Sequence, residues 1–244
     1  MTRTLSQRLP ETARGQDWIN QFDTADHELA RRLLESLVLV SGIEFERQLA
    51  SLLSETALKA TGPTAFFAVR EWPDSSLSYL YADQEADAVG AGGDIGSEGR
   101  VAAIIRGLCR MHPSQFLNHP SINAMHDAKC RLVVLVDDFV GSGDRVAEFY
   151  AALWANRTIR SWHSLGLIRF ALIAYAATNR GEQRVSKLID SQPKLVRGCP
   201  TFHDLPMRHQ ERSMLLSAIK KYATYTEHHR YPLGYGGTGS APVF

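Results

Sequence analysis

The stretch that decides the fold is RLVVLVDDFVGSGDRVAEFY, residues 131–150. The apolar run LVVLV leads without alternation into Asp137 and Asp138. Such a run is typical of a strand that is buried on both faces of a parallel sheet. A Gly-Ser-Gly turn at 141–143 and a segment with helical spacing follow. The stretch therefore predicts a strand, a tight turn and a helix, with two carboxylates where the strand meets the turn.

The rest of the chain predicts an α/β fold, a parallel sheet flanked by helices. Further strands are expected at TAFFAVREW (64–72), SLSYLYAD (76–83) and FALIAYAAT (170–178). Helices are expected over 26–40, 45–60, 101–111, 145–154 and 182–190, and from Pro206 to Tyr222. The first two helices precede the sheet, so residues 1–60 are expected to form an N-terminal helical extension and residues 61–244 the α/β domain.

The composition is that of an ordinary globular protein. The chain has 244 residues, 44% of them hydrophobic, and 27 basic residues against 26 acidic ones. A net charge of +1 provides no global electrostatic footprint for nucleic acid or an anionic membrane. The three cysteines, Cys109, Cys130 and Cys199, form no C-x-x-C pair, and the chain carries neither an apolar leader nor a membrane-length apolar run. These features predict a cytoplasmic protein without a membrane partner or a direct nucleic-acid ligand.

The acid pair lies where an open α/β sheet binds ligands, at the carboxyl ends of its strands. Adjacent carboxylates repel one another, a cost that is tolerable where they bind a divalent cation or the hydroxyls of a ligand. The glycines allow backbone N–H groups to approach an anion, which the following helix N-terminus also favours. Strand, acid pair, turn and helix together indicate a site for a phosphorylated sugar.

At these residues the sequence resembles a known family. VVLVDDFVGSG is similar to the phosphoribosyl-pyrophosphate loop of type I phosphoribosyltransferases. The order of VRE, GSEGR, DDFVGSG, AYAAT and PLGY further resembles the phosphoribosyltransferase-like (PRTase-CE) domains of bacterial conflict, or antiphage, systems. The resemblance implies that Asp137 and Asp138 hold the ribose hydroxyls, with Gly141, Ser142 and Gly143 at the phosphate.

The sequence departs from the family pattern directly after the turn, where Asp144 and Arg145 stand in place of a further hydroxyl. An aspartate in the first helical turn competes with a phosphate for the same N–H groups, and Arg145 offsets it. A ligand without a simple 5′-phosphate is therefore one interpretation, and Asp144 and Arg145 are both candidate ligand-binding residues.

The second loop of the family, which binds pyrophosphate, has two candidates. Arg70 in AVREW is the first, and GSEGR with Ser97 and Arg100 is the second. A surface salt bridge is the alternative for either arginine, and a helix cap is the alternative for GSEGR. For DDFVGSG itself, the alternatives are a solvated turn or the phosphate loop of another α/β family, such as a haloacid-dehalogenase-like phosphatase.

Two functional classes follow from the resemblance. The first is an enzyme, a pentosyltransferase within the glycosyltransferases, that transfers or hydrolyses a ribosyl phosphate from phosphoribosyl pyrophosphate or a nucleotide. Magnesium would reach Asp137 and Asp138 only through the bound ligand, and the protein would act as a defence effector with partner proteins from its operon. The second is a catalytically inactive module that senses a nucleotide or binds a partner. The acid pair favours the enzyme, whereas Asp144 favours the module.

A metal site among the histidines is disfavoured by the sequence. His112, His119 and His126 recur at intervals of seven residues, but prolines follow the first two.

Overall fold

The contacts within the chain divide it into two units. The structure is a computed structural model that describes residues 5–71, 79–86, 97–189, 191–205, 207–223, 233, 237–240 and 242–243. One unit, here the sheet unit, is Phe45–Gly198, and the other, the helical unit, combines Met1–Glu44 with Cys199–Phe244. The expected domain boundary near residue 60 stays a prediction. The contacts within the chain place residues 45–60, where the second helix was expected, in the sheet unit.

The sheet unit is built on five parallel strands in the order β3-β2-β4-β5-β6. The strands are β2 (Thr64–Ala68), β3 (Phe116–Asn118), β4 (Leu132–Val140), β5 (Arg169–Ala177) and β6 (Lys194–Gly198). β4 lies at the centre of the sheet, between β2 and β5, and residues 133–137 in it are all buried. The unbroken apolar run LVVLV fits this position, because both faces of a central parallel strand are covered.

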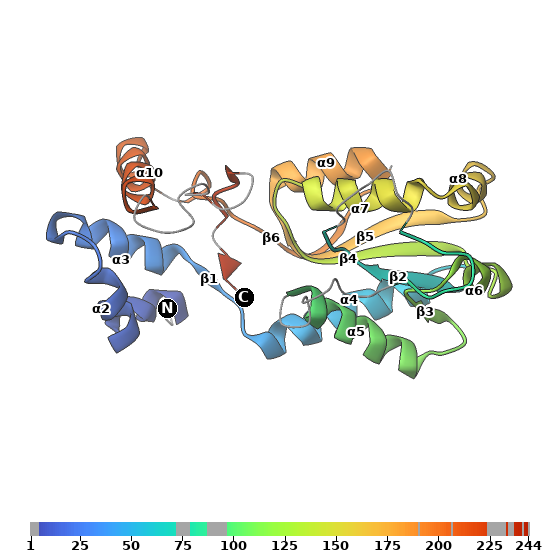
Figure 1. Cartoon of the computed structure of the whole chain (residues 1–244). Helices are drawn as coiled ribbons and strands as arrows, with labels where there is room; N and C mark the ends of the chain where they lie inside the picture. The colour runs from blue at the N-terminus through green and yellow to red at the C-terminus, as the bar shows by residue number, and fades with distance from the viewer. Residues whose placement is uncertain are drawn as a thin grey trace. The chain divides into compact units, whose positions relative to one another are not determined.

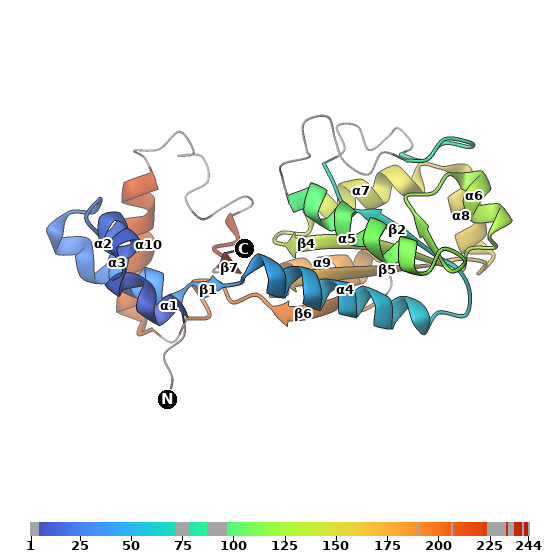
Figure 2. The ribbon, with the colours of Figure 1, turned by 90° about the horizontal axis from the view of Figure 1, so that it is seen from below.

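Helices cover both faces of the sheet, as Figures 1 and 2 show. On one face lie α7 (Asp144–Trp154), α8 (Arg157–Ser164) and α9 (Asn179–Ile189), and on the other α4 (Gly42–Leu58) and α5 (Ser97–Met111). Short α6 (Ile122–Asp127) precedes β4. Phe45 of α4 packs on Tyr175 of β5 with ring centroids 5.1 Å apart. The predicted α/β fold, a parallel sheet flanked by helices, is confirmed.

Three strand assignments in the sheet unit differ from the sequence-based expectation. Residues 79–83, the described part of SLSYLYAD, form no strand. Tyr79 and Leu80 are nevertheless buried, and Tyr79 packs on Phe149 at 4.7 Å between centroids, so the apolar pattern reflects packing of an irregular segment. β3 and β6 were not expected, because β3 has three residues and β6 is a half-exposed strand with the basic side chains Lys194 and Arg197.

The helical unit joins the two ends of the chain. Its elements are α1 (Leu5–Arg8), η1 (Leu9–Glu11), α2 (Ala13–Ile19), η2 (Thr24–Asp26), α3 (His27–Ser36), β1 (Val38–Leu39), α10 (His209–Ala223) and β7 (Pro242–Val243). β1 and β7 pair in parallel, and α10 contacts α3. Pro206, expected to open the last helix, lies outside the described residues, as does PLGY except for Leu233. No described helix has the length and apolar character needed to cross a membrane.

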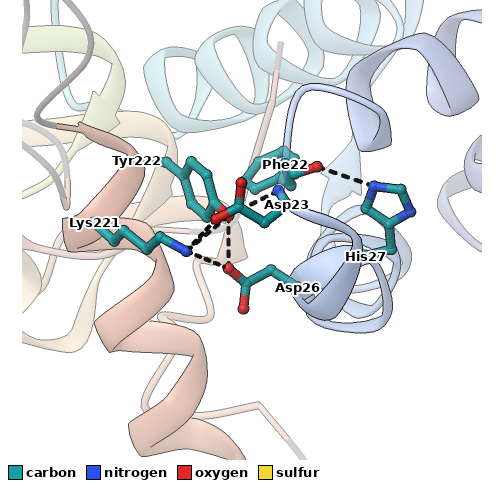
Figure 3. A network of polar contacts seen from close by, with 6 residues as sticks. All are labelled: Phe22, Asp23, Asp26, His27, Lys221 and Tyr222. Atoms are coloured by element: carbon teal, nitrogen blue, oxygen red, sulfur yellow. Dashed lines mark hydrogen bonds and ion pairs between the residues drawn. The ribbon is translucent and has the colours of Figure 1, made fainter.

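A polar network, shown in Figure 3, ties α10 to the segment before α3. Lys221 Nζ lies 2.6 Å from Asp23 Oδ2 and 2.8 Å from Asp26 Oδ2. The Tyr222 hydroxyl donates to Asp26 Oδ2 at 2.6 Å and accepts from the Asp23 backbone N–H at 2.9 Å. The hydrogen bonds from Lys221 lower the pKa of both carboxyl groups. These contacts join residues from opposite ends of the sequence.

Candidate functional site

The acid pair lies inside β4, because the strand continues past Val136 to Val140. The Asp137 side chain is 3% exposed and that of Asp138 14%. Each carboxylate accepts a hydrogen bond from the next backbone N–H: Asp137 Oδ1 from Asp138 at 2.9 Å, and Asp138 Oδ1 from Phe139 at 2.8 Å. Asp138 is therefore the more accessible of two carboxylates that the backbone holds in place.

Arg145, in the first turn of α7, contacts both carboxylates. Its Nη2 lies 2.5 Å from Asp137 Oδ1 and 3.0 Å from Asp138 Oδ1. The short turn between β4 and α7 brings this side chain back over the strand from which the acids project. Arg145 was expected to bind ligand, and in the structure its guanidinium is engaged by the acid pair.

The electrostatics of Asp137 are dominated by its burial. Loss of solvation raises the pKa of Asp137 well above its ordinary value and Asp138 raises it further, while Arg145 opposes both effects. Asp137 Oδ2 is buried and has no hydrogen-bond partner among the described residues. The negative charge on Asp137, and secondarily that on Asp138, raises the pKa of Arg145, which stays protonated. A proton on Asp137, or a hydroxyl group that donates to its carboxylate, would therefore be stabilised at this site.

Polar groups in the turn after β4 are engaged by other side chains of the same chain. Gly143, with φ of +81°, provides the left-handed backbone that precedes α7. The Ser142 hydroxyl donates to Asp144 Oδ2 at 2.6 Å, and the Asp144 backbone N–H lies 3.3 Å from Ser142 Oγ. Arg184 of α9 forms an ion pair with Asp144 Oδ1. The carboxylate of Asp144 therefore engages both the hydroxyl of the turn and Arg184 of α9.

The turn is fixed from the neighbouring strand and helix. Thr178, just after β5, donates through Oγ1 to the Gly141 carbonyl at 2.6 Å, and its backbone N–H bonds the Val140 carbonyl at 3.0 Å. Thr178 Oγ1 also accepts from the Gly181 backbone N–H at 3.0 Å. A Cβ at Gly181 would lie 2.5 Å from the Gly141 carbonyl oxygen. The backbone of α9 thus packs directly on the turn, and only glycine fits at 181.

The comparison with protein families agrees with this arrangement. The sequence matches the PRTase-CE family over residues 16–244. The chain belongs to the PRTase-CE family. This confirms the resemblance expected from the sequence and identifies a phosphoribosyltransferase-like domain, and the match extends over parts of both units. Among curated proteins and solved structures, no match to the chain was found.

Arg70 lies at the same edge of the PRTase-CE sheet as the acid pair. It follows β2, the neighbour of β4, and the Val69 backbone N–H still bonds the Val136 carbonyl at 2.8 Å. Its side chain is buried, with the guanidinium carbon 5.6 Å from the centre of the Tyr79 ring. Arg70 is therefore placed beside Asp137 and Asp138 by the strand order.

The second candidate segment of the PRTase-CE chain is placed less directly. The guanidinium carbon of Arg100 lies 4.7 Å from the centre of the Phe45 ring, and its Nη2 lies 4.0 Å from Glu46 Oε1. Both of these contacts are with α4. Ser97 opens α5, and its side chain is outside the described residues. Glu98 Oε1 accepts from the Glu71 backbone N–H at 3.3 Å, which brings the start of α5 to the end of β2.

Within the described ranges, no group of three or more His, Cys, Asp and Glu side chains could hold a metal ion. Asp137 and Asp138 supply two carboxylates, and both form ion pairs with Arg145. Magnesium fits this PRTase-CE site only if most of its oxygen ligands come from the phosphates of a bound molecule.

His119 is buried and accepts from the Ala68 backbone N–H through Nε2 at 2.9 Å, and its burial lowers its pKa to about 3.

Three residues of the site were not singled out by sequence reasoning: Thr178, Gly181 and Arg184. In the sequence, Thr178 is the last residue of AYAAT, and Arg184 lies within an expected helix. Their position in the sequence could have identified them. They follow β5, the strand next to β4, and the ends of neighbouring parallel strands meet at the same edge of the sheet.

Proposed function

We propose that this PRTase-CE domain binds the ribose of a nucleotide or of a sugar phosphate such as phosphoribosyl pyrophosphate, and transfers or hydrolyses the ribosyl group. The supporting observation is the acid pair within β4, in particular the buried Asp137 oxygen without a partner among the described residues. Replacing buried charges by well-packed apolar groups is often neutral or stabilising. Two carboxylates kept at the ligand edge of the sheet are therefore better explained by function than by stability.

The geometry supports distinct roles for the two acids. Asp138, the more accessible, would accept hydrogen bonds from the ribose hydroxyls. Asp137 and Arg145 would hold Asp138 in place and set the local charge. Breaking the bond at the anomeric carbon develops positive charge on the ribose ring, and fixed carboxylates in a partly buried site stabilise such charge. The acceptor of the ribosyl group would be water or a second molecule.

The leaving group would lie toward the neighbouring strand. Arg70, buried after β2, would offer positive charge to a leaving pyrophosphate or nucleotide phosphate. A magnesium ion carried by those phosphates would neutralise their charge. In a bacterial conflict system, such an activity would serve as a cytoplasmic antiviral effector with proteins of the same operon as partners.

A second candidate, a nucleotide-binding module without catalysis, is favoured by a different observation. Arg145 engages both carboxylates, and Asp144 engages the turn, so a ligand must exchange contacts that the chain already makes. A module of this kind would bind a ribose-bearing ligand at the same acids and leave its bonds intact.

Calorimetric titration distinguishes these possibilities. The wild-type protein would be titrated with phosphoribosyl pyrophosphate and magnesium, with nucleotides, and with nucleosides. Asp138→Asn is the test variant, and Asp127→Asn, on an 81% exposed side chain of α6, is the matched control. We expect at least one ligand to bind, with an affinity about tenfold or more weaker in Asp138→Asn and unchanged in the control. Circular dichroism would verify that both variants are folded.

Product analysis of the same mixtures separates the enzyme from the module. Release of free base or pyrophosphate by the wild type supports the enzyme, whereas binding without product supports the module. If no ribose-bearing ligand binds the folded wild-type protein, both candidates are wrong.

A further inference from the structure

We infer that Asp144 is a specificity-determining residue that makes the turn at 141–143 accept a ribose-bearing ligand with an uncharged 5′ end and disfavour a 5′-phosphate. This inference rests on the proposed function, because it concerns the part of the ligand beyond the ribose hydroxyls. It narrows the ligand class to nucleosides and other ribosyl donors that carry a free 5′-hydroxyl.

The first step concerns the helix N-terminus. A glycine turn that leads into a helix favours a negative charge, through its backbone N–H groups and the helix dipole. In this chain the first residue of α7 is Asp144, so the helix already carries its own negative charge there. A phosphate dianion at the same place would meet a carboxylate, and like charges at close range repel.

The second step concerns the groups that would otherwise bind a phosphate. The Ser142 hydroxyl donates to Asp144 at 2.6 Å, and Arg184 forms an ion pair with the same carboxylate. Arg145, the next cation, contacts the acid pair at 2.5 and 3.0 Å. A 5′-phosphate would therefore have to break existing contacts to gain either a hydroxyl or a guanidinium.

The third step concerns the rigidity of the turn. Thr178 holds the Gly141 carbonyl at 2.6 Å, and the backbone of α9 approaches so closely that Gly181 has no room for a Cβ. The turn cannot reshape around a phosphate without moving α9. An uncharged hydroxyl, in contrast, can donate a charge-assisted hydrogen bond to Asp144 without displacing Arg184.

The test is a comparison of nucleosides with their 5′-monophosphates by calorimetric titration of the full chain. For the wild type, we expect each nucleoside that binds to bind at least as tightly as its monophosphate. Asp144→Ser is expected to raise the affinity for the monophosphate relative to the nucleoside by about tenfold or more. Asp144→Glu keeps the negative charge and is expected to retain the wild-type ratio. Asp144→Asn, whose amide oxygen still accepts from Ser142, serves as the neutral variant if Asp144→Ser does not fold.

The outcomes separate this inference from the proposed function. If the neutral variant leaves the ratio unchanged, or if the wild type prefers the monophosphate about tenfold or more, the role of Asp144 is wrong while ribose binding stands. If neither nucleosides nor monophosphates nor phosphoribosyl pyrophosphate bind, the proposed function is overturned and this inference with it.

Discussion

Arg145 Nη2 lies 2.5 Å from Asp137 Oδ1, which links a carboxylate buried in the central strand to the first turn of α7. The same nitrogen lies 3.0 Å from Asp138 Oδ1, so one guanidinium contacts both carboxylates. The acid pair, Arg145 and the start of α7 are therefore electrostatically coupled. Removing the charge of Arg145 or of one carboxylate changes the pKa values of the remaining groups.

Replacing Arg145 by methionine should destabilise the protein at neutral pH. The variant leaves two neighbouring carboxylates without their cation, and breaking a buried ion pair costs about 3 kcal/mol or more. The loss should shrink as the pH falls to about 4, because protonation of Asp137, whose pKa is raised by burial, removes the repulsion between the two acids. Urea denaturation at both pH values would measure this, with Arg160→Met, an exposed arginine of α8, as control. An equal loss at both pH values would show that the effect is not electrostatic.

Replacing Asp137 by asparagine should change how stability depends on pH. Burial raises the pKa of Asp137 in the folded protein, so folding favours its protonated form. The contribution of Asp137 to the free energy of unfolding is then most favourable below the unfolded-state pKa, near 3.8, and is lost as the pH rises through the folded-state pKa. Each unit of pKa difference corresponds to about 1.4 kcal/mol. Relative to wild type, Asp137→Asn should therefore gain stability as the pH rises above about 4, and identical pH profiles for the two proteins would refute the raised pKa.

His119 should give the opposite slope. Burial, and then the charges of Arg70 and Arg106, lower its pKa from 6.5 to about 3, so the folded protein keeps it neutral. Its contribution to stability is complete above the unfolded-state pKa and is lost as the pH falls toward the folded-state value, by about 1.4 kcal/mol per pH unit. His119→Gln lacks this titration. The difference in unfolding free energy between wild type and variant should therefore narrow from pH 6.5 to 5.5, and a constant difference would contradict the prediction.

Replacing Gly181 by alanine should disturb the turn. The added Cβ would lie 2.5 Å from the Gly141 carbonyl oxygen and 2.6 Å from that of Val140, both backbone atoms, so α9 must move. We expect a loss of about 2 kcal/mol in stability, together with weaker ligand binding. Gly107→Ala is the matched control, because nothing lies within 4 Å of its Cβ position in α5, and it should stabilise by up to about 1 kcal/mol. Similar thermal denaturation curves for both variants would contradict the close packing of α9 on the turn.

The central strand and its acid pair could be predicted from the sequence because their signal is local. LVVLV has no alternation, and the carboxylates and glycines follow directly. β3 and β6 could not be predicted in this way, since one is very short and the other is a half-exposed strand whose pattern is not apolar. The strand predicted around Tyr79 and Leu80 was wrong because these two residues are buried without belonging to a strand.

The contacts of the site were harder to predict than its location. The position of Arg145 after the turn was visible, but its attachment to both acids depends on how the turn directs α7 back toward β4. Thr178, Gly181 and Arg184 belong to the next strand and helix, so only the strand order places them at the turn. Sequence reasoning therefore identified the residues within one strand-turn-helix segment and missed those that the neighbouring segment supplies.

The central claim, that the acids of β4 bind ribose hydroxyls, is tested most directly by removing those hydroxyls. Calorimetry would compare a nucleoside that binds the wild type with its 2′,3′-dideoxy counterpart, in the wild type and in Asp138→Asn. The account predicts that the wild type loses about tenfold or more in affinity when the hydroxyls are absent, and that Asp138→Asn binds both ligands equally weakly. Equal affinity of the wild type for the two ligands would contradict it.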